Sequence, residues 1–214
     1  MTEPRNKIFL RWAQDNGVHE NDYLFVAILA FCKQFELDAE KLIATSAAFQ
    51  RTASEIPAER HSRYCSLVFE NHLIDSIDDL LVIAENSIDT SIVRTTGAVY
   101  TPRFIVDYLV DEVLGDLRCR DEKNIFIDPC CGSGNFLVVA VQKISSMLDC
   151  DLRTASAKVA GFDINPMAIR QSNLILDLLC YQDCGESSLA RLECLDSLIL
   201  PVSEQLRRVS ASTG

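Results

Sequence analysis

One run of residues carries the strongest chemical signal in this chain. Residues 128–137 read Asp-Pro-Cys-Cys-Gly-Ser-Gly-Asn-Phe-Leu, between a short apolar stretch at 125–127 and a longer one with helical spacing at 136–148. This order predicts a turn that joins a buried strand to a helix. Glycine has no Cβ, so Gly132 and Gly134 allow positive φ and let a ligand lie against the backbone. The free amides at the helix start add a favourable dipole.

The acid at the start of this run distinguishes between two classes of nucleotide-type ligand. Asp128 stands at the end of the predicted strand, where its carboxylate suits a cationic amino group better than a phosphate. The Lys-Ser/Thr ending of a phosphate-binding loop is missing from the run. We therefore expect S-adenosylmethionine rather than ATP as the ligand. The alternative is that the two glycines only make a tight turn.

The elements that must position this turn follow an alternating pattern after residue 97. The apolar spacing predicts helices and strands in the order helix 103–114, strand 124–128, helix 134–148, strand 158–163, helix 166–180 and strand 190–194. Repeated strand-helix units predict an α/β fold with a parallel sheet, in which ligands bind beyond the carboxyl ends of the strands. Asp128, Asp163 and Asp196 fall at or just past three such ends, so we expect them at one edge of the sheet. Helix capping is the alternative role for Asp163 and Asp196.

The first part of the chain has helical spacing throughout. Helices are expected over residues 23–35, 39–52, 58–70 and 75–88. Asn21 or Asp22 could cap the first, Asp38 could cap the second, and Pro57 stands where the third would start. The polar stretch 89–97 ends in glycine and marks a boundary. We expect a helical N-terminal domain over residues 1–93 and a cofactor-binding domain over residues 94–214.

Composition excludes several classes of protein. The 214 residues are 48% hydrophobic, with no apolar stretch long enough to cross a bilayer and no signal-peptide core at the N-terminus, so we expect a cytoplasmic protein without a membrane partner. Nine cysteines without a repeated spacing favour reduced thiols over disulfides. Cys180, Cys184 and Cys194 have no fourth ligand at suitable spacing, so no metal is expected. The net charge of −11 gives neither part of the chain a basic clamp for nucleic acid.

Four motifs, taken in order, resemble a known enzyme family. They are Gly-Ala-Val-Tyr-Thr-Pro at 97–102 followed by Ile105 and Val106, the run at 128–137, Gly-Phe-Asp-Ile-Asn-Pro at 161–166 followed by Ala168, and Leu-Asp-Ser-Leu at 195–198. Their order resembles that of N6-adenine DNA methyltransferases, above all the modification subunits of type I restriction-modification systems and related fused restriction enzymes. The resemblance covers about residues 95–200. It implies a partial Rossmann-like methyltransferase sheet behind a helical N-terminal domain.

The resemblance also implies a role for individual residues. Thr101 and the helix amides after it would receive the carboxylate of the methionine moiety, and Asp128 would bind its amino group. Asp163 would accept the ribose hydroxyls. Ile164 would pack on the adenine face, while Asp196 would accept from the adenine amino group. The full expected cofactor set is Tyr100, Thr101, Pro102, Asp128, Cys130, Gly132, Gly134, Asn135, Phe136, Asp163, Ile164, Asp196 and Ser197.

Two of these positions, and the neighbouring Cys131, also have other interpretations. Thr101 before Pro102 is a good start for any helix. Cys130 and Cys131 are expected to be small buried residues, with a reactive thiol at the helix start as the alternative.

The likeness stops at the part that would hold the target base. The family uses an Asn/Asp-Pro-Pro-Tyr/Phe loop for the flipped adenine, and no two of the six prolines are adjacent in this sequence. No catalytic residue is therefore assigned, and only a polar stretch is expected after residue 200. The first hypothesis is the cofactor-binding portion of an adenine-specific DNA methyltransferase, inactive by itself.

The second hypothesis is a non-catalytic, methyltransferase-like interaction or regulatory module. Under the first, DNA would be reached through a missing C-terminal part or a partner such as a specificity or restriction subunit. The third strand would be an uncovered edge, so a homodimer formed through it or through the N-terminal helices is also expected.

Overall fold

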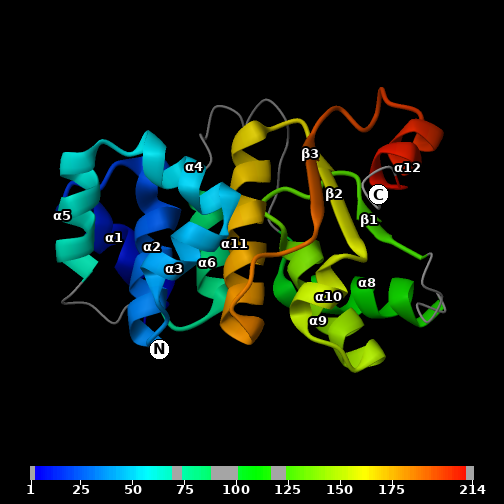
Figure 1. Ribbon diagram of the computed structural model, residues 1–214, viewed down its shortest axis with the longest axis horizontal. Helices are drawn as coiled ribbons and strands as arrows, with labels where there is room; N and C mark the ends of the chain where they lie inside the picture. Colours follow the sequence, from blue (N-terminus) through cyan, green and yellow to red (C-terminus); the bar gives the residue numbers. More distant parts are fainter. Residues whose placement is uncertain (1–2, 69–73, 88–100, 117–123, 211–214) are drawn as a thin grey trace. The chain divides into compact units, whose positions relative to one another are not determined.

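The sheet of this protein has three short parallel strands. A computed structural model describes residues 3–68, 74–87, 101–116 and 124–210. The strands β1 (Phe126–Asp128), β2 (Val159–Asp163) and β3 (Arg191–Cys194) pair in the order β1-β2-β3 (Figure 1). The expected α/β fold and its three strands are confirmed, and each strand begins one or two residues later than expected. In this order β3 lies at an edge of the described sheet, as expected, and β1 lies at the other edge.

Helices between the strands form a layer on the sheet. α9 (Asn135–Leu148) contacts β1 and β2, and α11 (Pro166–Cys184) contacts β2 and β3. The two helices also contact each other, because the apolar stripe of each faces the same core. Both were expected from their spacing, and α11 continues four residues beyond the expected end.

A short helix between α9 and β2 was not expected. α10 (Leu152–Ser156) begins after Asp151, whose Oδ1 accepts a hydrogen bond from Thr154 N at 2.6 Å. Only five residues are helical, so the segment is too short to show a 3.6-residue period. The sequence signal for this helix was its capping residue, Asp151.

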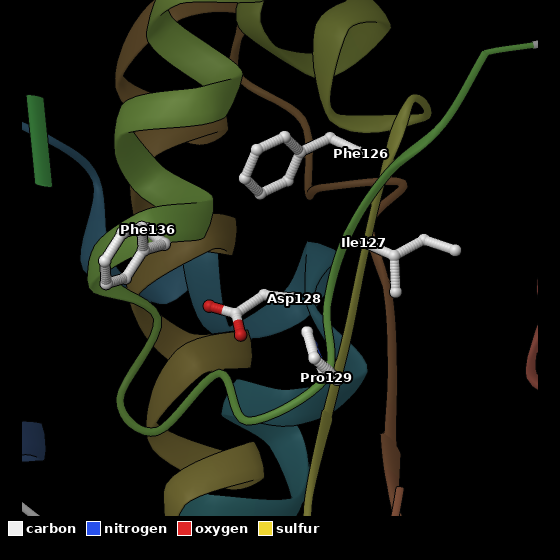
Figure 2. Close-up of a pocket in the computed structure, with 5 residues that line it drawn as sticks. All are labelled: Phe126, Ile127, Asp128, Pro129 and Phe136. Atoms are coloured by element: carbon white, nitrogen blue, oxygen red, sulfur yellow. The ribbon is translucent and has the colours of Figure 1, made fainter. Parts of the chain in front are cut away.

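The polar stretch after residue 200 contains a helix that was not expected. α12 (Val202–Ser210) places Val209 in an apolar cluster with Ala160 and Phe162 of β2. Ile127 belongs to the same cluster and points to the side of β1 opposite Phe126 and Asp128 (Figure 2). α12 therefore packs on the face of the sheet that α9 does not cover. The sequence hides this because few of its side chains are buried and the rest of the helix is polar or exposed.

One more helix precedes β1. α8 (Arg103–Asp116) follows Thr101 and Pro102 and packs against α9. The backbone amides of Ile105 and Val106 donate to Pro102 O at 2.9 and 3.2 Å. Pro102 therefore stands at the helix start, as expected from its fixed φ.

The N-terminal part is helical, as expected. Its elements are α1 (Arg5–Asp15), the 3₁₀ turn η1 (Glu20–Asp22), α2 (Tyr23–Gln34), α3 (Ala39–Thr45), α4 (Ala47–Glu55), α5 (Ala58–Val68) and α6 (Ile77–Asn86). The helix expected over residues 39–52 is wrong in one respect, because it is interrupted at Ser46. That residue has extended backbone angles, and its Oγ accepts from Phe49 N at 3.1 Å to begin α4.

The expected caps have mixed outcomes. Asp38 caps α3 as expected, with Oδ1 accepting from Lys41 N at 2.9 Å. Asp22 does not cap α2. It is buried, and its Oδ2 accepts from Tyr64 Oη at 2.9 Å and from Arg60 Nη1 at 3.0 Å. A buried carboxylate without hydrogen-bond partners costs more free energy than an uncapped helix end, so Asp22 binds these side chains instead of capping α2.

The chain divides into two compact units. One comprises Met1–Ala98 with Gly185–Ser187, and the other Val99–Cys184 with Ser188–Gly214. The expected domain boundary between residues 93 and 94, like the last expected residues of two N-terminal helices, lies outside the described residues. Among the helices of the described part, none is both long and apolar enough to cross a membrane.

Candidate functional site

The turn between β1 and α9 has the shape that its glycines predicted. Gly132 has φ +53° and Gly134 has φ +97°, and α9 begins at the next residue. Gly134 occupies the cap position without a side chain to satisfy the first amides of α9. The helix start therefore presents its amides to whatever lies over the turn.

Hydrogen bonds from neighbouring elements fix this turn. Gly132 N donates to Asp163 Oδ2 at 2.9 Å, and Cys131 N donates to Phe162 O at 2.8 Å, so β2 holds it on one side. Ser172 Oγ of α11 donates to Gly132 O at 2.7 Å. The turn is thus held to β2 and α11 before any ligand is bound.

The two glycines are required for different reasons. A Cβ at Gly134 would lie 3.1 Å from Ser172 Oγ and 3.3 Å from Ser172 Cβ, so α11 leaves no space for a side chain there. A Cβ at Gly132 would meet no atom within 4 Å among the described residues. Gly134 therefore serves close packing, whereas Gly132 leaves open space over the turn.

Asp163 links the turn to the end of β2. Besides the bond from Gly132, its Oδ1 accepts from Asn165 N at 2.8 Å. Asn165 caps α11 itself, since its Oδ1 accepts from Met167 N at 2.9 Å. Capping of α11 is therefore not the role of Asp163. An ionised carboxylate has about four acceptor positions, so two remain for the hydroxyls of a ligand.

Asp128 lies in a small pocket beside β1. The cavity has a volume of about 180 Å³ and is lined by Phe126, Ile127, Asp128, Pro129 and Phe136. Figure 2 shows the Asp128 carboxylate on the same side of β1 as the Phe126 ring, pointing toward the start of α9, where Phe136 lies. Its Oδ1 accepts from Cys130 N at 3.0 Å.

Burial changes the acidity of two groups at the turn. It raises the pKa of the Asp128 carboxyl above the ordinary value; the bond from Cys130 N opposes the rise, and the negative charge of Asp163 adds to it. Burial, together with the charges of Asp128 and Asp163, also raises the pKa of the Cys131 thiol. Cys131 is therefore the small buried residue expected, with its thiol protonated. The same expectation was wrong for Cys130, which is exposed because its side chain leaves the turn on the solvent side.

The segment after β3 reaches back to the turn. Ser197 Oγ donates to Pro129 O at 2.6 Å, and Cys130 Sγ lies 3.9 Å from Ser197 Oγ. Asp196 Oδ1 accepts from Leu198 N at 3.0 Å, which makes a local turn several residues before α12 rather than a helix cap. Ile164 is 61% exposed after β2. The residues expected around the adenine, which are Ile164, Asp196 and Ser197, thus lie after the carboxyl ends of β2 and β3.

The remaining expected residues lie partly inside and partly outside the described part of the chain. Asn135 is buried and Phe136 lines the pocket, both in the first turn of α9. Thr101 is partly buried before α8, and its role toward a carboxylate stays a prediction. Tyr100 lies outside the described residues.

Ser172 was missed by the sequence analysis. It is one of several polar residues in the long apolar stretch of α11, and only the fold shows that its hydroxyl meets the turn. The available signal was a small polar residue on a buried helix face, which is too common to single out one position.

Comparison with families and curated proteins gives two findings. The model of the N-6 DNA Methylase family matches residues 86–187. The Type II methyltransferase M.VspI of Vibrio sp. (strain 343) is 31% identical over 115 residues, which are 54% of this chain and 24% of that protein. The chain therefore spans about a quarter of the length of this relative.

Solved structures give two further findings. The DrdV–DNA complex, determined by cryo-electron microscopy, has a TM-score of 0.51 and 16% identity, covering 91% of this chain and 22% of that chain. A protein assigned as a modification subunit of a type I restriction enzyme from Vibrio vulnificus YJ016 has a TM-score of 0.43 and 21% identity, covering 66% of this chain and 28% of that chain. At such identities the likeness to DrdV concerns the fold alone.

Proposed function

We propose, from the match of residues 86–187 to the model of the N-6 DNA Methylase family, that the chain is the S-adenosylmethionine-binding portion of an adenine-specific DNA methyltransferase of a restriction-modification system. In this proposal residues 94–214 form the cofactor domain and residues 1–93 a helical domain. The relative M.VspI is a type II methyltransferase, which supports the reaction class. Bound S-adenosylmethionine would supply a methyl group on a positively charged sulfur.

The observation that carries the proposal is the contact between Asp163 and the glycine turn. An acid at the end of β2, 2.9 Å from Gly132 N, borders the open space over Gly132. In parallel α/β sheets an acid at this place accepts the ribose hydroxyls of a nucleotide, and the glycine turn accommodates the rest of the ligand. The residues present therefore fit an adenosine carrying a charged chain.

The two ends of such a ligand have different partners in this proposal. Asp128, in the pocket that Phe126 and Phe136 also line, would hold the amino group of the methionine moiety, because carboxylates and aromatic faces both attract cations. Thr101, with Tyr100 and Pro102 beside it, would receive the carboxylate. The exposed Ile164 would pack on the adenine, and Asp196 would accept from its amino group with Ser197 beside it.

The base-holding part of the reaction would come from elsewhere. The 214 residues contain no Pro-Pro pair, so a loop for the flipped adenine would be supplied by a further segment or a partner chain. DNA contact would follow the same route, because the net charge of −11 does not favour binding of phosphates by this chain alone. We expect no methyl transfer without that part, and the specificity or restriction subunit is the candidate partner. A homodimer through an edge strand is the other association we propose, and light scattering at high concentration tests it.

Calorimetric titration with S-adenosylmethionine and S-adenosylhomocysteine tests the cofactor assignment. Asp163→Ala removes a charged acceptor worth about 1.5 to 3 kcal/mol, so affinity should fall about ten- to hundredfold. Asp183→Ala is the matched control. That carboxylate also accepts a backbone amide, Leu152 N at 2.9 Å, but at the far end of α11.

Two outcomes would overturn parts of the proposal. Equal affinity of wild type and Asp163→Ala would remove Asp163 from the site. No binding by the wild type would favour the alternative function, a non-catalytic interaction or regulatory module. Methyl transfer to DNA after mixing with the product of a neighbouring reading frame would exclude that alternative.

A further inference from the structure

Both polar groups of the Gly132 backbone are held by side chains from other elements. Its amide donates to Asp163 Oδ2 at 2.9 Å, and its carbonyl accepts from Ser172 Oγ at 2.7 Å. The first contact is made by Asp163, the acid proposed above to bind the ribose. The second comes from Ser172 of α11, which is outside the expected cofactor set.

Ser172 is built into the packing beneath the turn. Its side chain is fully buried, and the backbone at Gly134 lies so close that a Cβ there would be 3.1 Å from Ser172 Oγ. The hydroxyl also interacts with the Cys131 thiol of the same turn, and sulfur is a weaker acceptor than the Gly132 carbonyl. Burial also removes competing water, which strengthens the bond to Gly132 O.

The hydrogen bond determines which way one peptide group faces. A trans peptide is planar, so the carbonyl of Gly132 and the amide of Ser133 point in opposite directions. With the carbonyl directed at α11, the amide is directed to the side of the turn away from that helix. The place of a Cβ on Gly132 is open to 4 Å among the described residues, so a ligand has room against this peptide.

We propose that Ser172 is a positioning residue for the cofactor, because its hydroxyl fixes the Gly132–Ser133 peptide against which the methionine moiety of S-adenosylmethionine lies. This inference rests on the proposed function and deepens it. The hydroxyl itself does not touch the ligand. It orients the backbone that does, so its loss should affect ligands that carry the methionine moiety more than those that lack it.

The experiment compares two ligands and three variants of the 214-residue chain. S-adenosylhomocysteine carries the amino-acid moiety, whereas 5′-methylthioadenosine shares the adenosine but lacks it. Ser172→Ala removes the hydroxyl, and Ser172→Cys fills its volume with a weak donor. Ser156→Ala is the control, since Ser156 is also fully buried and its Oγ accepts from Leu189 N at 2.8 Å, away from the turn.

The expected result is selective. Both Ser172 variants should bind S-adenosylhomocysteine about three- to tenfold more weakly in calorimetry, the size of one lost hydrogen bond. Their affinity for 5′-methylthioadenosine should stay unchanged, and Ser156→Ala should bind both ligands like the wild type. If Ser172→Ala does not fold, Ser172→Cys carries the same comparison, because it leaves no cavity.

Two results would overturn the inference, and a third concerns its premise. Equal losses for both ligands would mean that Ser172 only supports packing. Unchanged affinity for both ligands in Ser172→Ala or Ser172→Cys would mean that the hydroxyl does not position the turn. A wild-type chain that binds neither ligand would overturn the proposed function instead, so the two failures are distinguishable.

Discussion

The two loops at the carboxyl edge of the sheet differ in how they are held. The turn from Asp128 to Gly134 is fixed by β2 and by a buried hydroxyl of α11. The segment after β3 is held by bonds within itself, from α12 and to Asp163 and Pro129, yet it exposes Leu198 by 90% and Ile199 by 81%. The first loop is fixed without any ligand, whereas the second has apolar side chains in solvent.

This difference indicates that, in the proposed complex, the methionine end of the ligand would lie against the more rigid surface. Groups that are already fixed lose little conformational entropy when a ligand binds. Affinity for the methionine end should therefore be sensitive to small changes in the turn. The exposed adenine-side segment should tolerate change, because few of its side chains are packed. Substitutions in and beside the two loops test this contrast.

Gly134→Ala should have the largest effect on stability. Its φ of +97° is unfavourable for alanine, and the added Cβ would approach Ser172 Oγ to 3.1 Å. Strain and overpacking together should lower the free energy of unfolding by about 2 to 4 kcal/mol, measured by urea denaturation. Gly132→Ala is the matched control and should lower it by only about 1 kcal/mol, because it has strain at φ +53° without a clash. Equal losses in the two variants would contradict the packing argument.

Gly132→Ala should instead weaken cofactor binding. The new Cβ would occupy the open space in which the ligand is proposed to lie, and a steric conflict of about 1 to 3 kcal/mol corresponds to roughly a ten- to hundredfold loss. Titration with S-adenosylhomocysteine measures it. A Gly132→Ala variant that binds as tightly as the wild type would show that the ligand lies elsewhere.

Asp128 should make stability and binding respond to pH in opposite ways. Its folded pKa is raised, so the folded state retains the proton longer, and stability falls as pH rises from the unfolded value of about 3.9 through the folded value. Asp128→Asn should therefore be more stable than wild type at neutral pH and lose this advantage in acid. Binding of the amino group needs the carboxylate, so wild-type affinity should fall as pH drops through the folded pKa.

Denaturation and titration across a pH series measure both effects. The side-chain amide oxygen in the Asp128→Asn variant can still accept from Cys130 N, so the variant tests the charge rather than the turn geometry. A variant less stable than wild type at neutral pH would contradict the assignment of burial as the main cause.

Leu198→Ser should have the smallest effect. The side chain is 90% exposed, so the free energy of unfolding should change by no more than about 0.5 kcal/mol. Val209→Ala in the neighbouring α12 is the contrast, because this side chain is buried and its truncation should cost about 2 kcal/mol. Thermal or urea denaturation of both variants would show whether the segment after β3 is as loosely packed as its exposure indicates.

The sequence predicted the sheet unit well because its signals are strong and local. Apolar runs of strand length, a glycine turn and helical spacing each fix one element, and Asp163 stood out because it ends a strand. Ser46 was missed because a serine inside an apolar period is compatible with a continuous helix. α12 was missed because its few buried side chains meet residues far away in the sequence. Ser172 could not be found, since its partner is a backbone carbonyl that only the fold brings near.

The bond between Ser197 and Pro129 connects residues that are 68 positions apart. Loop closure over this distance must be compensated by the pairing of β3 with β2, so the contact forms only when the last described strand has docked. We therefore expect this contact to form late in folding, so that a chain with an incomplete sheet would have the glycine turn without its closing contact. Affinity for the proposed cofactor should then report whether the described sheet has assembled, not merely whether the turn has formed.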